Sequence, residues 1–163
     1  MSRLSFAVIS ALFFLLQGSF LPFISGGTAE PDLWLVASVI SLIVYDKRTA
    51  LLFAALGGVL TEIVIGNFFG LHLFPYLVTT LVTAAFIRAK YHRRLFVSLY
   101  YTATASCLYI FVMWCVIWFS GAHVPVLDYV LYRAWKIIGL NIIAAVFIHH
   151  LFWSVKKEWV SKW

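Results

Sequence analysis

Three ionisable side chains lie inside apolar stretches of this sequence: Glu62, Arg133 and Lys136. A charge at the centre of a lipid-embedded helix costs about 2.5 to 3.5 kcal/mol on insertion scales, so such a residue usually has a partner or a function. If both stretches are helical, a rise of about 1.5 Å per residue places Glu62 about 6 Å and Arg133 about 9 Å below the same membrane boundary. We therefore expect these two side chains to lie at matching depths.

Three interpretations of this pair stay open. Glu62 and Arg133 form a buried ion pair that fixes the register of two helices, or a ligand or proton site, or part of an interface with another protein. Lys136 lies one turn deeper than Arg133, and Asn141 follows on a neighbouring arc of the same helix. We expect this last helix to have one polar side, which faces either a partner or the bundle interior.

Small residues precede Glu62 at four-residue spacing: Ala50, Ala54 and Gly58. Such a track lets another helix backbone approach closely. Packing against a helix of the same chain is the favoured interpretation, and an interface with a partner is the alternative. Gly58 is not followed by the Lys-Ser or Lys-Thr pair of a phosphate-binding loop.

Signs of catalytic or metal chemistry are weak. The serines in the apolar stretches have no histidine at helical spacing, and the five histidines are scattered. Cys107 and Cys115 are eight residues apart in one apolar stretch, too far along a helix to bridge, and have no zinc-binding spacing. The sequence thus predicts a protein that is not an enzyme, with no cofactor and no metal site.

The composition requires a lipid environment. Of the 163 residues, 64% are hydrophobic and 11% charged, against about 45–50% and about 25% in soluble domains. Mean hydropathy is +0.99. The net charge of +6 comes from short basic clusters between apolar stretches, so we expect no nucleic-acid partner. An integral membrane protein is predicted.

Charges and turn-forming residues divide the chain into six apolar stretches. They cover about residues 4–24, 33–45, 49–65, 69–87, 95–119 and 127–153. The predicted fold is an all-α, single-domain, six-helix transmembrane bundle. The second and third stretches are short against the roughly 20 residues needed to span a membrane. Asp32, directly after Pro31, is the expected N-cap of the second helix.

Lysine and arginine favour cytoplasmic loops, which gives a test of this topology. The basic residues outside the stretches fall on the side predicted to be cytoplasmic: Arg3, Lys47, Arg48, Arg88, Lys90, Arg93, Arg94, Lys156, Lys157 and Lys162. Both termini are therefore expected in the cytoplasm. A cleavable signal peptide is the alternative at the N-terminus, but its apolar region would have about 7–15 residues, and the first stretch here has about 21.

The loop with Arg88, Lys90, Arg93 and Arg94 is expected to attract anionic lipid at about 1 kcal/mol per basic residue, or else an acidic protein.

Several short motifs share their order and spacing with a known family. They are Pro31-Asp32-Leu33, then Gly58 to Glu62, then the run Gly66-Asn67-Phe68-Phe69-Gly70-Leu71-His72. Over about residues 31–82 the chain resembles the rod shape-determining protein MreD family. Glu62 stands where that family usually has aspartate.

The resemblance implies a non-enzymatic protein of the bacterial inner membrane with five or six helices. It implies action beside MreC, MreB, RodA and the penicillin-binding partner of RodA in building the lateral cell wall. We expect a scaffold that binds MreC laterally in the membrane, through the helix face that carries Gly58 and Glu62. The family is similar in fold to the substrate-binding S components of energy-coupling-factor vitamin importers. The alternative function is therefore such a component, with a pocket of Glu62, Arg133, Asn67 and Trp34 open to the outside.

Overall fold

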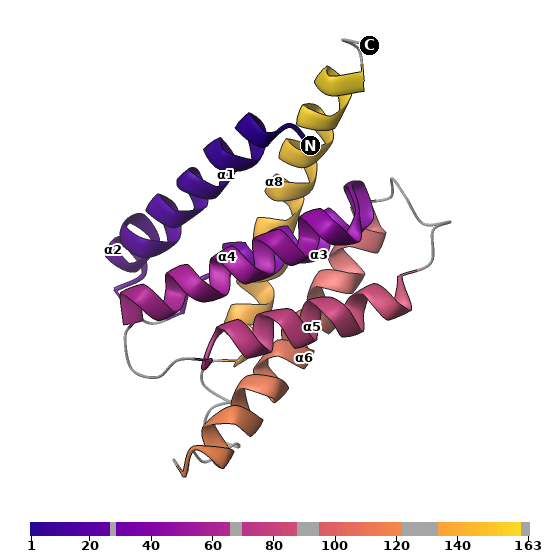
Figure 1. Ribbon diagram of the computed structural model, residues 1–163. Coiled ribbons are helices and arrows are strands. Elements are labelled where there is room, and N and C mark those ends of the chain that lie inside the picture. The colour runs from indigo at the N-terminus through magenta and orange to yellow at the C-terminus, as the bar shows by residue number, and fades with distance from the viewer. Residues whose placement is uncertain (27–28, 66–69, 88–94, 122–133, 161–163) are drawn as a thin grey trace.

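The computed structural model describes residues 1–26, 29–65, 70–87, 95–121 and 134–160. All regular structure in these ranges is helical. The elements are α1 (Arg3–Leu15), the π-helical turn η1 (Leu16–Phe20), α2 (Leu21–Ser25), α3 (Leu33–Val44), α4 (Lys47–Ile65), α5 (Leu73–Phe86), α6 (Leu95–Phe119) and α8 (Trp135–Val160). Figure 1 shows them as one bundle, with the N-terminus and the C-terminal end of α8 at the same end.

The observed helices follow the six predicted stretches. The first predicted helix is one continuous helical segment, α1, η1 and α2, which ends where Gly26 adopts a left-handed φ of +58°. The bounds of α3 and α6 agree with the prediction to within a residue. Two bounds differ. In the described part, α5 begins at Leu73, four residues late, and α8 continues seven residues past 153. In this extension Lys156 donates a hydrogen bond to the Val44 carbonyl of α3, and Lys157 is exposed.

Among the described residues, three helical segments are long and apolar enough to cross a membrane: Arg3–Ser25, Leu95–Phe119 and Trp135–Lys157. The apolar helices α3 and α5 have 12 and 14 residues. At about 1.5 Å per residue they reach about 18 and 21 Å, short of the roughly 30 Å hydrocarbon core. A membrane protein with three such helices is supported, and six complete crossings stay a prediction.

Helix α3 lies at the centre of the bundle. All twelve of its residues are buried, and it packs against α4, α5, α6 and α8. A helix that is apolar on every side is stable only when it is enclosed on every side, which explains its continuous hydrophobic sequence. Asp32 caps its start, as predicted, because Oδ1 accepts a hydrogen bond of 3.0 Å from the Leu35 N–H. At its other end the Tyr45 hydroxyl donates to the Phe152 carbonyl of α8, at 2.8 Å.

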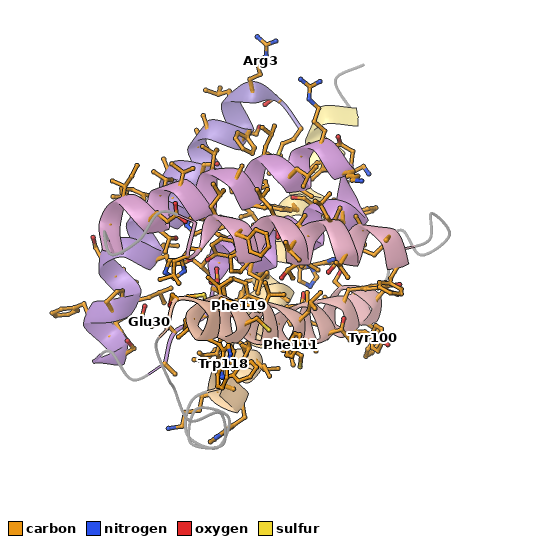
Figure 2. The ribbon with its side chains drawn as sticks, turned by 60° about the horizontal axis from the view of Figure 1, so that its bottom comes forward. Arg3, Glu30, Tyr100, Phe111, Trp118 and Phe119 are labelled. Atoms are coloured by element: carbon orange, nitrogen blue, oxygen red, sulfur yellow. The ribbon has the colours of Figure 1, made fainter. Side chains whose placement is uncertain are left out.

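Aromatic rings join the N-terminal helix to this centre. Phe13 of α1 lies 6.1 Å from Trp34 of α3, 6.3 Å from Phe53 of α4 and 6.4 Å from Phe152 of α8, between ring centroids. Large apolar side chains also cover the outside of the bundle. Phe111 and Phe119 of α6, labelled in Figure 2, are 60% and 87% exposed. Such a surface is suited to lipid.

Candidate functional site

Asp32 is the centre of a group of buried and half-buried polar side chains. Its Oδ2 accepts a hydrogen bond of 2.6 Å from the Tyr76 hydroxyl of α5. Its main-chain N–H donates to Oδ1 of Asn141 in α8, at 2.6 Å, and Nδ2 of Asn141 donates to Oγ of Ser106 in α6, at 3.0 Å. The next N–H, of Leu33, donates to Gln17 Oε1 in η1 at 2.9 Å. The first turn of α3 is thereby tied to four other elements.

Glu62 holds the start of α5. Its Oε1 accepts hydrogen bonds from the main-chain N–H groups of Gly70, His72 and Leu73, at 2.7, 3.2 and 3.0 Å. The N-terminus of a helix carries unpaired N–H groups and a partial positive charge, so a carboxylate is stabilising there. Gly70 has a φ of +100°, a conformation that favours glycine. Oε2 of Glu62 is buried and has no hydrogen-bond partner among the described residues.

The predicted partner of Glu62, Arg133, lies outside the described residues. What the structure places against Glu62 is a turn of main-chain N–H groups. The interpretation as an ion pair therefore stays a prediction.

Two further contacts join the Glu62 turn to the Asp32 group. Nδ1 of His72 lies 3.3 Å from the Tyr109 hydroxyl of α6. The Tyr109 ring stacks on the Tyr76 ring, with centroids 5.0 Å apart. We call the connected set the polar network; it comprises Gln17, Asp32, Glu62, His72, Tyr76, Ser106, Tyr109 and Asn141. Three motif residues belong to the polar network: Asp32, Glu62 and His72. Gly70 lies in the turn that Glu62 holds. Of the other motif residues, Pro31 lines a surface groove, and Gly66 lies outside the described residues.

The last helix does not have one polar side. Asn141 is fully buried, whereas Lys136 is exposed, with Nζ 5.7 Å from the centre of the Trp135 ring. Five residues of α-helix turn the chain about 140° away from the starting direction, so the two side chains point to different surroundings. The expectation of one polar side that includes Lys136 and Asn141 and faces a partner or the bundle interior is wrong.

The small-residue track of α4 packs inside the bundle. Ala50 and Ala54 are fully buried, and Gly58 is buried. A Cβ atom on Gly58 would lie 2.5 Å from Cα of Leu73, and one on Gly57 would lie 2.4 Å from Cβ of Trp34. The chain itself covers this surface. The expectation that MreC contacts the face of Gly58 and Glu62 is corrected accordingly.

One serine–histidine contact was not predicted from the sequence. Oγ of Ser98 in α6 lies 2.8 Å from Nδ1 of His149 in α8, and both side chains are buried. The residues are 51 positions apart on different helices, so no spacing rule finds them. Gln17, Tyr76 and Ser106 were also missed. A lone polar side chain in a long apolar stretch, such as Gln17, was the available signal.

The hollows of the described surface include the following three. A cavity of about 230 Å³ near the end of α2 is lined by Gln17, Glu30 and Trp34, with Thr61 of α4. A groove of about 410 Å³ lies between α1 and α8, and a cleft of about 400 Å³ lies between α5 and α6. The described residues include no group of three histidine, cysteine or acidic side chains placed to hold a metal ion. The basic residues Arg88, Lys90, Arg93 and Arg94 lie outside the described residues.

In the described part of the chain, the regular structure is helical and three helical segments are long and apolar enough to span a membrane. No family model, no curated protein and no solved structure matches this chain.

Proposed function

We propose that this chain is a non-enzymatic scaffold of the bacterial inner membrane, of the MreD type, which binds the single transmembrane helix of MreC. The scaffold would act in peptidoglycan synthesis with RodA, its penicillin-binding partner and MreB. The motifs that resemble the MreD family support the proposal. Their residues Asp32, Glu62 and His72 all serve one network that positions helices, which is the role expected of structural motifs.

The groove between α1 and α8 is the observation on which the proposal rests. Its eleven lining residues are all apolar, among them Leu12, Leu16, Leu33, Ile143 and Phe147. Its two walls are helices long enough to span a membrane. Another transmembrane helix gains close packing there, which is the main force between helices in lipid. The α4 face with Gly58 and Glu62 is covered by the chain itself and is not free to bind MreC. We therefore place the MreC site in this groove instead.

The orientation of the chain agrees with this assignment. Figure 1 shows the N-terminus and the end of α8 together, and Figure 2 shows Arg3 and Glu30 at opposite ends of the N-terminal helix. Lys156 and Lys157 therefore lie at the end of the bundle that carries Arg3. Clustered basic residues favour the cytoplasmic side. Both termini in the cytoplasm is the proposed topology.

In-membrane photocrosslinking tests the proposal. A photoreactive residue at Ile143 or Phe147, which line the groove, should crosslink to MreC in cells. The same residue at Phe111 is the matched control, because Phe111 is exposed on α6 and lines none of the three hollows. Adducts with MreC from the groove positions and not from Phe111 support the proposal. Equal adducts from all three positions, or adducts with lipid alone, overturn it.

The second candidate is the substrate-binding component of a vitamin importer. The cavity near Trp34 favours it, because an aromatic side chain lies there with an amide and a carboxylate, from Gln17 and Glu30. Both polar groups already have partners: Gln17 accepts from the Leu33 N–H, and Glu30 accepts from the Ser25 hydroxyl at 2.8 Å. Purification with paired ATPases and a coupling subunit, instead of MreC, would favour this candidate.

A further inference from the structure

The cavity near the end of α2 lies between the N-terminal helical segment and the last two turns of α4. It is lined from η1 by Gln17 and Gly18, from α4 by Thr61 and Val64, and from α3 by Trp34. Its volume is about 230 Å³, below the roughly 300–1,000 Å³ of pockets for drug-sized ligands. The cavity therefore has room for a small molecule or for the end group of a larger one.

The wall at η1 keeps this cavity open. The π-helical turn spans Leu16–Phe20, and such turns inside helices often occur at functional sites. A Cβ atom on Gly18 would meet nothing within 4 Å, so close packing does not require glycine there. Phe14 of α1 and Val64 of α4, which also line the cavity, are 38% and 57% exposed. The cavity thus reaches the surface of the bundle between α1 and α4.

The charge at the cavity is negative. Among the described residues that line it, Glu30 is the sole charged one. All the lining residues belong to the segments 4–46 and 49–87, which contain no lysine or arginine. Opposite charges attract more strongly away from bulk water. The cavity therefore favours a cation over an anion.

Hydrogen-bond acceptors lie around the same space. Oε1 of Glu30 accepts from the Ser25 hydroxyl at 2.8 Å, and a carboxylate has about four acceptor positions, so Glu30 can accept further bonds. Gln17 Oε1 is held in place by the Leu33 N–H at 2.9 Å and has a second lone pair. Thr61 supplies a hydroxyl. A cation that also carries N–H donors can use the charge and these acceptors together.

We propose that this cavity binds a primary ammonium group, with Glu30 as the counter-ion and Gln17 and Thr61 as further acceptors. The group belongs either to the ethanolamine headgroup of a phospholipid or to a free small amine. A headgroup can reach the cavity between α1 and α4, near the end of the first apolar helical segment. Figure 2 shows Glu30 at the opposite end of that segment from Arg3. This inference does not depend on either candidate function.

Native mass spectrometry of the full chain in mild detergent tests the lipid source. The protein is equilibrated with phosphatidylethanolamine and phosphatidylcholine in equal amounts and with the same acyl chains. The two lipids share a phosphate, but the quaternary ammonium of choline has no N–H donor. We expect the protein to retain phosphatidylethanolamine about tenfold over phosphatidylcholine, the factor that corresponds to one charge-assisted hydrogen bond.

Equilibrium dialysis with radiolabelled ethanolamine tests the free amine. A preference for phosphatidylethanolamine identifies the headgroup as the source and supports the proposal. Binding of ethanolamine without that preference supports the proposal with a free amine as the source. Equal retention of the two lipids together with no binding of ethanolamine overturns it.

Two pairs of variants locate the site. Glu30→Gln keeps the shape and an acceptor for Ser25 but removes the charge, and should weaken binding about tenfold. Its control is Asp46→Asn, which removes an exposed carboxylate between α3 and α4. Gly18→Leu fills the cavity and should abolish binding. Its control is Gly139→Leu, because Gly139 is also exposed, also has open space at Cβ, and does not line the cavity.

The outcomes of these variants are distinct once gel filtration shows that each is folded. Losses in Glu30→Gln and Gly18→Leu, with wild-type binding in both controls, support the cavity as the site. Unchanged binding in Glu30→Gln or in Gly18→Leu overturns it. An equal loss in a variant and its control also overturns it, because the effect would then not depend on the cavity.

Discussion

The Asn141 side chain of α8 accepts a hydrogen bond from the main-chain N–H of Asp32, a residue 109 positions earlier. The same amide group donates to Ser106 of α6. One fully buried side chain therefore joins three helices that the sequence places far apart. The partners are the main-chain N–H of the half-buried Asp32 and the hydroxyl of the fully buried Ser106, so the loss of these two bonds leaves polar groups without a partner, at a cost in stability.

Asn141→Leu should destabilise the bundle. A buried polar group without a partner costs about 1–3 kcal/mol in soluble proteins. Interhelical hydrogen bonds in membranes are weaker, with a measured average near 0.6 kcal/mol. We expect a loss of about 2 kcal/mol for the two bonds together, measured by reversible unfolding in mixed detergent and dodecyl sulfate. Ile143→Ala is the control, since Ile143 is exposed on the same helix, and it should cost less. An equal cost for both variants would contradict the role of Asn141.

Variants of Glu62 should separate a helix cap from an ion pair. Glutamine keeps a side-chain oxygen that can accept from the N–H groups of Gly70, His72 and Leu73, whereas leucine removes it. If the cap dominates, Glu62→Gln should keep most of the stability and Glu62→Leu should lose about 1–3 kcal/mol. If a charged contact with Arg133 dominates, glutamine and leucine should be equally damaging. Thermal unfolding in detergent followed by circular dichroism distinguishes the two results.

The glycines of α4 and α8 should respond in opposite ways to alanine. A Cβ on Gly58 meets the backbone of Leu73, which cannot rotate away, whereas a Cβ on Gly139 meets nothing within 4 Å. Gly58→Ala should therefore lower the yield of folded protein. Gly139→Ala should stabilise α8 by up to about 1 kcal/mol, because glycine costs more entropy in a helix interior than alanine. Gel filtration in detergent measures the folded yield, and the prediction fails if the two variants behave alike.

Local and cooperative features of this fold differ in how well the sequence predicts them. The N-cap at Asp32 and the bounds of α3 follow from nearest neighbours in the chain, and both were predicted. The inward direction of the Ala50, Ala54 and Gly58 track depends on which helix lies opposite, so the sequence left two interpretations. The contacts of Asn141 with Asp32 and Ser106 depend on three helices meeting at one depth. No spacing within a single helix contains that information.

Labelling of introduced cysteines should decide the number of membrane crossings. An odd number, such as the three long helices alone, puts the termini on opposite sides, whereas six put them on the same side. Single cysteines at Ser2, Glu30, Ser120 and Lys157, in a background with Cys107 and Cys115 replaced by serine, report both ends of the first and the last spans. A membrane-impermeant maleimide applied to intact cells should label the cysteines at 30 and 120 and not those at 2 and 157. The cysteines at 2 and 157 should react once the cells are permeabilised.

Labelling at 157 in intact cells would mean that α3, α4 and α5 together cross an even number of times. With an even number of crossings in these three helices, α1 and α8 would run through the membrane differently from the topology proposed above. The groove between them would then not be the one proposed to bind MreC.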